Sequence, residues 1–252
     1  MARSFEKFYE IKEGRFVFEP TTKARKIGEE ILNDLFKIWS PPDHFYHLGK
    51  SKGHVEALRV YSKSRLFASI DIENFFGSVT RTKISRSLRA IGIDDKKGFS
   101  IAYDSVVDFG GTKTLPYDFI QSVALATLVM EFSALGNAIR QAIKSNVMIT
   151  VYVDDIILSG EHAETLQHHF DEFVRTTNAA KFNISAKKCQ NVSDKIEVFN
   201  CNLSKSHIST TPKRMAQFKV DYAHASDARR ASIEKYITAV NKSQVAELGR
   251  LH

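Results

Sequence analysis

Hydrophobic positions near the N-terminus repeat with helical spacing. Residues 22–39 place apolar side chains every three or four positions, which predicts an amphipathic helix. Pro41 and Pro42 follow directly and end it. Residues 1–22 are mixed in character and rich in aromatic side chains, and we expect an arm or a short strand pair around Arg15–Glu19.

The middle of the chain changes between strand-like and helical patterns. Residues 66–72 (LFASIDI) are rich in β-forming residues and predict a strand. Helical spacing returns over 80–91, and a second helix is expected over about 98–109. A turn-rich loop, GGTKTLPYDF, follows, and the apolar stretch 121–144 contains no proline, which predicts one long unbroken helix.

Two apolar segments, 147–153 and 156–158, flank the pair Asp154-Asp155, which predicts a β-hairpin with the acids at its tip. A helix is expected over 162–179, short strands over 181–210 and helical structure from Thr211 onward. Interleaved strands and helices around an antiparallel hairpin favour an α+β fold, with helices behind one face of the sheet, over a doubly wound fold.

A basic segment lies between the first helix and the first strand. Residues 44–59 combine two glycines with Lys50, Lys52, His54 and Arg59, so we predict a loop that approaches an anionic group. The alternative is an ordinary solvated basic loop.

Charge and composition indicate which binding partners and cellular location the chain is expected to have. The chain has 252 residues and a net charge of +7, which favours a polyanionic partner. No apolar run approaches the roughly 20 residues of a membrane span, and the N-terminus lacks the apolar core of a signal peptide, so a cytoplasmic protein without membrane contact is expected. Cys189 and Cys201 lack the spacing of a zinc site, and a disulfide is not expected between them.

Three acidic residues carry the candidate chemistry. Taken alone, Asp154-Asp155 could form a solvated turn, and Asp71 could cap a helix. Apolar residues flank all three, however, and buried carboxylates need a compensating cation. If the strand and the hairpin share a sheet, the three acids converge. Hard oxygen ligands suit Mg²⁺, and two such ions support phosphoryl transfer.

Five segments occur in an order that resembles the reverse transcriptase family. They are SIDIENFF, LPYDFIQSV, YVDD, FNISAKKC and VFNCNLS, and together they cover roughly residues 66–210. The resemblance implies a palm, with an antiparallel sheet backed by helices, reduced fingers and a short helical thumb. It implies an arm and fingers over 1–65, a palm with finger insertions over 66–210 and a thumb over 211–252. The implied activity is RNA-directed DNA polymerase, a nucleotidyltransferase.

The resemblance also implies roles for individual residues. Asp71, Asp154, Asp155 and the carbonyl of Ile72 would hold two Mg²⁺ ions, with Mn²⁺ as an alternative. Lys188 would be the general acid that protonates pyrophosphate, although the neighbouring Lys187 could take its place.

Further implied roles concern the nucleotide. Phe76 would exclude a ribose 2′-hydroxyl and so select dNTPs, while Phe75 is expected to pack in the core. Tyr152 and the Gln121-Ser122 pair would lie against the incoming nucleotide.

Asp118 departs from the family pattern. It stands where the family usually has glycine, next to the expected nucleotide, and Val123 stands where proline is usual. Aspartate adds bulk and negative charge beside a polyanion. We therefore also consider the hypothesis that the DNA product is biased in sequence or templated partly by protein groups.

The stretch from Phe45 to Leu88, with LPYDFIQS and ALG at 134–136, is similar to bacterial reverse transcriptases of the abortive-infection and defence-associated groups. That similarity implies antiviral defence, RNA binding, and association with a template and primer, a non-coding RNA, a partner protein or further copies of the chain. Two other hypotheses remain: template-independent or protein-templated DNA synthesis, and a non-catalytic nucleic-acid-binding subunit. A cyclase-type palm enzyme is more distant, because it would not carry the LPYDFIQS segment.

Overall fold

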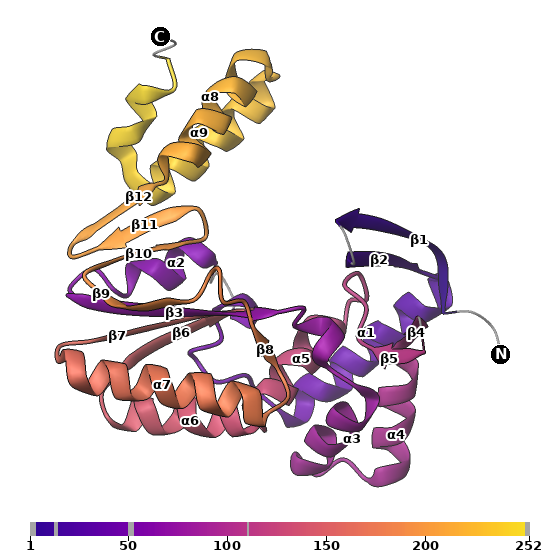
Figure 1. Cartoon of the computed structure of the whole chain (residues 1–252). Helices are drawn as coiled ribbons and strands as arrows, with labels where there is room; N and C mark the ends of the chain where they lie inside the picture. Colours follow the sequence, from indigo (N-terminus) through magenta and orange to yellow (C-terminus); the bar gives the residue numbers. More distant parts are fainter. Residues whose placement is uncertain (1–3, 13–14, 50–52, 110, 250–252) are drawn as a thin grey trace.

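The computed structural model describes residues 4–12, 15–49, 53–109 and 111–249, and its centre is an antiparallel sheet (Figure 1). Strand β3 (Leu66–Glu73) lies in the middle and pairs with β7 (Asp155–Gly160), which pairs in turn with β6 (Met148–Tyr152). On its other side β3 pairs with the short strands β8 (Asn183–Ile184) and β9 (Gln190–Ser193). The expected β6–β7 hairpin and the α+β fold are confirmed.

The central strands are buried on both faces. Helices α6 (Ala134–Lys144) and α7 (Ala163–Ala179) cover one face, where Ile156 and Leu158 join the main hydrophobic core (Figure 1). On the other face Ile157 joins a second core with Phe67. The Tyr61 hydroxyl donates to the Ile157 carbonyl at 2.8 Å. This double burial explains why residues 156–158 form a continuous apolar run.

A helical lobe lies at one end of the sheet (Figure 1). It contains α1 (Thr22–Ile38), α3 (Arg81–Ala90), α4 (Asp95–Asp104) and α5 (Ser122–Glu131). Two small hairpins complete it, β1 (Phe5–Lys12) with β2 (Arg15–Pro20), and β4 (Val107–Phe109) with β5 (Thr112–Thr114). The strand pair expected near the N-terminus is therefore present.

The C-terminal part forms a separate sheet followed by helices. Strands β10 (Lys195–Val198), β11 (Cys201–Ser204) and β12 (His207–Thr210) form an antiparallel meander. Helices α8 (Pro212–His224) and α9 (Asp227–Asn241) follow, with a short 3₁₀ turn over Lys242–Glu247. The Gln244 amide bonds both the N–H and the carbonyl of Thr210, at 2.7 and 3.2 Å, which fastens this last segment to β12.

The single helix predicted over 121–144 is wrong, because the chain bends by 68° between α5 and α6. Ser133 has extended backbone angles and caps α6, with its hydroxyl accepting from the Gly136 N–H at 3.3 Å. A Cβ built on Gly136 would lie 2.1 Å from the Glu131 carbonyl oxygen, so the bend needs glycine there.

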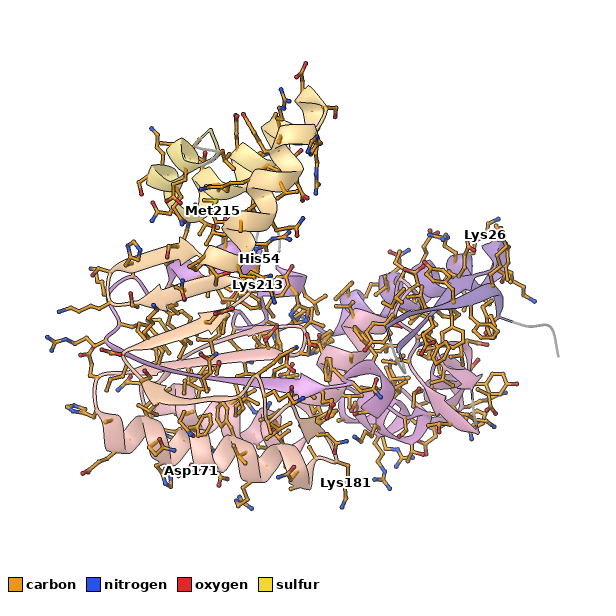
Figure 2. All side chains as sticks on the ribbon, turned by 45° about the horizontal axis from the view of Figure 1, so that its top comes forward. Lys26, His54, Asp171, Lys181, Lys213 and Met215 are labelled. Atoms are coloured by element: carbon orange, nitrogen blue, oxygen red, sulfur yellow. The ribbon has the colours of Figure 1, made fainter. Side chains whose placement is uncertain are left out.

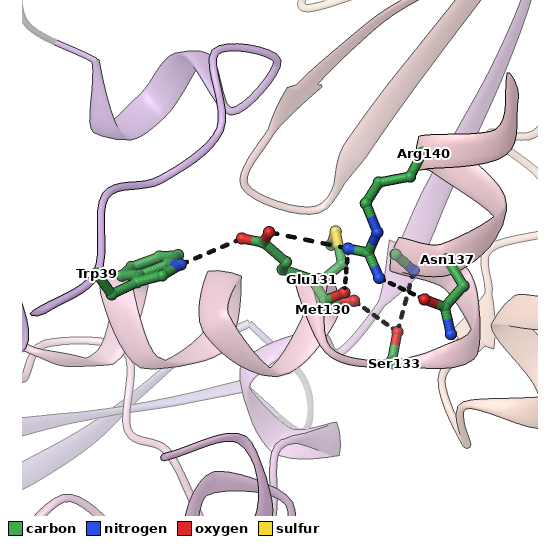
Figure 3. A network of polar contacts seen from close by, with 7 residues as sticks. Trp39, Met130, Glu131, Ser133, Asn137 and Arg140 are labelled. Atoms are coloured by element: carbon green, nitrogen blue, oxygen red, sulfur yellow. Dashed lines mark hydrogen bonds and ion pairs between the residues drawn. The ribbon is translucent and has the colours of Figure 1, made fainter. Parts of the chain in front are cut away.

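A polar network closes the bend (Figure 3). The Arg140 guanidinium donates to the Glu131 carbonyl at 2.8 Å and to the Asn137 side chain, and it pairs with the Glu131 carboxylate at 3.8 Å. The Trp39 indole N–H donates to the same carboxylate at 3.3 Å. Burial raises the pKa of Glu131, and the Trp39 hydrogen bond and the Arg140 charge oppose this shift. The carbonyl left free by the broken helix is therefore satisfied.

Two other boundaries differ from the predictions. The helix expected over 98–109 runs from Asp95 to Asp104, and residues 107–109 form β4 instead. Asp94 caps its start, accepting from the Lys97 N–H at 3.0 Å. Val107 is buried in a small core with Phe5 and Phe119 of the same lobe, so tertiary packing decides that this segment is extended.

The basic segment 44–59 is not one loop. Residues Tyr46–Leu48 form a 3₁₀ turn, and His54–Arg59 form helix α2. Val55, Ala57 and Leu58 of α2 are buried, and Val55 and Leu58 join the second core, which stabilises a helix too short to show clear periodicity.

Among the described residues, no single helix has the length and hydropathy to cross a membrane. Helices α5 and α6 reach that threshold only when taken together across their bend.

We predict that Gly136→Ala lowers the free energy of unfolding by about 1–3 kcal/mol, because the new methyl group meets backbone atoms that cannot move aside. Urea denaturation measures the change. The matched control is Gly98→Ala in α4, where the nearest side-chain atom would be 3.7 Å away, and there we expect a gain of about 0.4–1 kcal/mol. Equal effects at both positions would contradict this account of the bend.

Candidate active site

Strand pairing brings the three acidic residues together. In the β3–β7 register, Asp71 lies directly opposite Asp155. The Ile72 N–H donates to the Asp154 carbonyl at 2.9 Å, which extends the pairing into the hairpin turn. Opposite residues of an antiparallel pair have Cα atoms about 4.5–5.5 Å apart. The backbone alone therefore holds all three residues at one end of two neighbouring strands.

Lys188 compensates the buried charge of Asp71. The Asp71 side chain is 5% exposed, and its Oδ2 accepts from Lys188 Nζ at 2.6 Å. This hydrogen bond is the main reason that the pKa of Lys188 is raised, with burial opposing it and the Asp71 charge adding to it. The Asp71 carbonyl also accepts from the Ser185 N–H at 2.9 Å, which ties the segment before Lys188 to β3. A cation is thus already positioned at the acidic cluster.

Burial and neighbouring negative charges both act on the Asp155 carboxyl group. Burial, together with the charges of Asp154 and Asp71, raises its pKa to about 7, and only the charge of Lys188 opposes the shift. Among the described residues, no three or more His, Cys, Asp or Glu side chains converge into a preformed metal cage. The oxygen donors and their mutual repulsion suit a hard divalent cation, although a shift of the Asp71–Lys188 pair would have to accompany its binding.

The turn that carries Asp154 is strained. Val153 has a φ of 59°, a conformation unfavourable for a β-branched residue and usually occupied by glycine in such hairpins. A strain of this kind costs roughly 1–3 kcal/mol and persists only where the surroundings fix it. The Val153 N–H donates to Nδ1 of His47 at 2.8 Å. No sequence pattern marks His47, because this contact joins residues far apart in the chain.

Aromatic rings gather beside the acidic hairpin. Tyr152 makes edge contacts with Phe199 at 5.4 Å and with His54 at 5.9 Å. Phe199 and Asn200 form the β10–β11 turn with φ of 54° and 58°. A cavity of about 700 Å³ lies on one side of this turn, lined by Asp155, Lys187 and Lys188 among others. A second cavity, of about 400 Å³, lies between the turn and the C-terminal helices.

This chain is similar to a known protein family over most of its length. The model described as reverse transcriptase (RNA-dependent DNA polymerase) matches residues 11–220. The chain belongs to the reverse transcriptase family. The acidic strand and hairpin therefore belong to a reverse transcriptase palm, and the expected palm fold is confirmed.

Solved structures with the same fold come from distant proteins. Telomerase from Candida albicans, in complex with a fragment of telomeric RNA, matches 89% of this chain with a TM-score of 0.56 and 9% identity. Apo telomerase from Candida tropicalis matches 75% with a TM-score of 0.53 and 10% identity. The genome and RNA polymerase complex inside a double-stranded RNA virus matches 80% with a TM-score of 0.53 and 14% identity.

This chain spans less than half of each of those chains: 46%, 45% and 21%. No curated protein sequence matches it. The likeness at these identities concerns the fold.

Phe75 and Phe76, which follow β3, pack against different parts of the protein. Phe76 follows β3 and is 6% exposed, with its ring 4.9 Å from that of Tyr117 in an edge contact. Phe75 is 2% exposed and packs on Phe182 at 5.6 Å. Phe75 is thus a core residue as expected, and Phe76 forms an aromatic pair with the LPYDFIQSV segment.

Gln121 and Ser122 lie inside the protein. Both are fully buried at the start of α5, and Gln121 Nε2 donates to the Ser105 hydroxyl at 3.4 Å. Among the described residues, Gln121 Oε1 and Ser122 Oγ have no hydrogen-bond partner, so two buried polar atoms remain unsatisfied at the start of α5. Asp118, by contrast, is exposed in the loop before α5. Direct contact with a nucleotide is therefore geometrically easier for Asp118 than for Gln121 or Ser122.

Two of the proposed basic contacts face the C-terminal helices. His54 lies at the base of those helices (Figure 2), with its Nε2 3.4 Å from the Tyr236 hydroxyl, and burial lowers its pKa. Arg59 donates to the Ala239 carbonyl at 2.5 Å and pairs with Glu56 at 3.5 Å. Both side chains thus join α2 to α9. Lys50 and Lys52 lie outside the described residues.

The pKa of Asp155 makes the metal-free protein sensitive to pH. Its folded-state pKa of about 7 lies above the ordinary value of 3.8, so the native state loses stability as pH rises from about 4 through about 7. We predict that Asp155→Asn is more stable than the wild type at about pH 8 by about 1–4 kcal/mol, since each pKa unit corresponds to about 1.4 kcal/mol.

Urea denaturation in a metal chelator measures this difference, which should shrink as the pH falls toward about 4. The exposed Asp194→Asn is the control and should show no such trend. A difference that does not depend on pH would contradict the repulsion argument.

Proposed function

We propose that this chain is an RNA-directed DNA polymerase that adds dNTPs to a 3′-hydroxyl by two-metal phosphoryl transfer. The observation that carries the proposal is the β3–β7 register, which holds Asp71 opposite Asp155 at the end of the acidic hairpin of a reverse transcriptase palm. Phosphoryl transfer needs little from the protein beyond positioning and neutralisation of charge. Adjacent strands supply the positioning, and the carboxylates supply sites for cations.

Asp71, Asp154, Asp155 and the carbonyl of Ile72 would hold two Mg²⁺ ions, with Mn²⁺ as the alternative. The ions supply charge neutralisation for the attacking and leaving oxygens. In the structure Lys188 Nζ bonds Asp71. If Asp71 binds a cation instead, the Lys188 ammonium group would be free to turn toward the cavity that it lines with Lys187. There it would donate its proton to the leaving pyrophosphate.

The substrates proposed for this face are a nucleic-acid template and primer with dNTPs. A net charge of +7 favours such a partner. One structure of similar fold, the Candida albicans telomerase, is described in complex with telomeric RNA, although at 9% identity. Tyr152 and Asp118 would both lie beside the incoming nucleotide.

A second candidate function concerns the template. Asp118 is exposed where the family pattern has glycine, so its charge would lie beside the nascent base pair. This observation favours a biased product, from template-independent or protein-templated DNA synthesis on the same palm. A catalytically silent nucleic-acid-binding subunit is less favoured, because all three acidic residues are present.

The biological setting proposed is antiviral defence in the cytoplasm, with a non-coding RNA, a partner protein or a second copy of the chain completing the enzyme. The support is the similarity of residues 45–88 to defence-associated reverse transcriptases. The test in cells is protection against phage, which should disappear when Asp154 and Asp155 are both changed to asparagine.

The first experiment measures incorporation of each labelled dNTP by the purified chain in Mg²⁺, with co-purified nucleic acid kept or removed. We expect the double change Asp154→Asn and Asp155→Asn to lower incorporation by at least about 100-fold, because the cation sites are lost. The control is Asp194→Asn, an exposed acid on the palm.

Nuclease treatment separates the two candidate functions, since templated synthesis should stop and template-independent synthesis should continue. Equal incorporation by the double variant and the wild type would reject the assignment of these carboxylates.

A further prediction concerns the choice of sugar. The Phe76 ring is buried and packs on Tyr117, which restricts its freedom to turn aside for a 2′-hydroxyl. We predict that Phe76→Ala raises the ratio of rNTP to dNTP incorporation by roughly 10–100-fold, with dNTP incorporation retained. Phe75→Leu is the control, because Phe75 packs in the core on Phe182. An unchanged ratio in Phe76→Ala would remove Phe76 from the proposed nucleotide site.

A further inference from the structure

The strained hairpin turn needs support that its own sequence does not provide. Val153 occupies the left-handed region at φ 59°, with neither glycine nor asparagine at that position. The next two residues are Asp154 and Asp155, so any relaxation of Val153 would move both carboxylates. Something outside the turn must therefore fix its conformation.

His47 contacts the turn from a segment that runs beside β6. The Val151 N–H donates to the His44 carbonyl at 2.8 Å, and Phe45 forms a parallel bridge with Val151. Phe45 is 1% exposed, which fixes this segment in the core. The backbone of His47 is thus anchored to the strand that leads into the turn.

The hydrogen bonds of His47 determine where its ring proton lies. Thr127 donates its hydroxyl to the Val123 carbonyl at 2.8 Å, so Thr127 Oγ1 must accept from His47 Nε2, 2.7 Å away. Nδ1 is then the unprotonated nitrogen, and it accepts from the Val153 N–H at 2.8 Å.

Nδ1 also lies 3.4 Å from the Val151 carbonyl. A hydrogen bond there would require a proton on Nδ1. The neutral ring cannot satisfy both partners through one nitrogen, and the shorter contact to Val153 decides between them.

The surroundings favour this neutral form. Burial lowers the pKa of His47 to about 4, so the ring carries no charge near neutral pH. Thr127 is 1% exposed in the middle of α5, a helix buried on nearly every side. The chain of bonds from Val153 through His47 and Thr127 to Val123 therefore ends on a rigid element.

We propose that His47 is a positioning residue of the polymerase, whose neutral Nε2–H form fastens the Val153 turn to α5 and thereby holds Asp154 and Asp155 in register with Asp71. The proposal rests on the proposed polymerase function for its kinetic consequence, while the protonation pattern stands on the hydrogen bonds alone. His47 itself does not touch substrate or metal. Its loss should act on the metal-dependent step rather than on nucleotide affinity.

The kinetic test uses variants that remove one bond at a time. His47→Asn places an amide oxygen near the position of Nδ1 but cannot reach Thr127, whereas His47→Leu removes both bonds. Thr127→Val removes the hydroxyl, and Thr127→Ser restores it. We expect kcat to fall most in His47→Leu, on the order of 10–100-fold, with the KM for dNTP nearly unchanged and more Mg²⁺ needed for half-maximal rate.

We expect the kcat of His47→Asn and of Thr127→Val to lie between that of the wild type and that of His47→Leu. Thr127→Ser should recover most of the kcat that Thr127→Val loses. The matched control is His169→Leu, which removes another buried imidazole, carried by α7. All rates are taken at a temperature where thermal denaturation shows each variant folded. If His47→Leu matches His169→Leu in kcat and in Mg²⁺ requirement, His47 is only a structural residue and the proposal is overturned.

The second test reads the ring directly in the unmodified full chain. Long-range ¹H–¹⁵N NMR of the histidine side chains should show His47 with an unprotonated Nδ1 and a protonated Nε2 at neutral pH. A proton on Nδ1, or a charged ring, would overturn the proposal. If the wild type incorporates no dNTP under any condition, the polymerase function fails and this spectrum still decides the protonation pattern.

Discussion

Three carboxylates in neighbouring backbone positions repel one another, and the palm must compensate this repulsion for the fold to be stable. Pairing of β3 with β7 forces Asp71 and Asp155 to face each other, and burial makes their charges interact strongly. Lys188 offsets part of this repulsion through Asp71. The Lys188 ammonium group is thus the cation that compensates the buried Asp71 carboxylate in this structure.

Two strained turns define the surroundings of that site. Val153 precedes the acidic pair, and Phe199 with Asn200 forms the neighbouring turn, all with positive φ. Rings from Tyr152, Phe199 and His54 contact one another between the two turns, and His54 also contacts Tyr236 of α9. Strain in the backbone is thus offset by packing across three elements, a common arrangement where side chains must hold one orientation.

The sequence predicted much of the fold and less of the site. Two continuous apolar runs with an acidic pair between them predict the β6–β7 hairpin, because strands buried on both faces have apolar residues at successive positions. The bend before Gly136 was missed, since a serine and a glycine are weak signals within an apolar stretch. The apolar flanks and the motif order predict a cluster of Asp71, Asp154 and Asp155, and the strand register brings these residues together. The partners of Lys188 and His47 were not, because each contact joins residues that only the tertiary fold brings together.

The long separation along the chain between paired residues has a consequence for how the protein is made. Asp71 pairs with β7, which begins 84 residues later in the chain, and its hydrogen bond with Lys188 spans 117 residues. Closing such loops costs entropy before any contact repays it. During synthesis the ribosome must therefore release nearly the whole palm before the acidic site exists. A truncated nascent chain carries β3 as an unpaired apolar strand, an exposed edge that chaperones or neighbouring chains could capture.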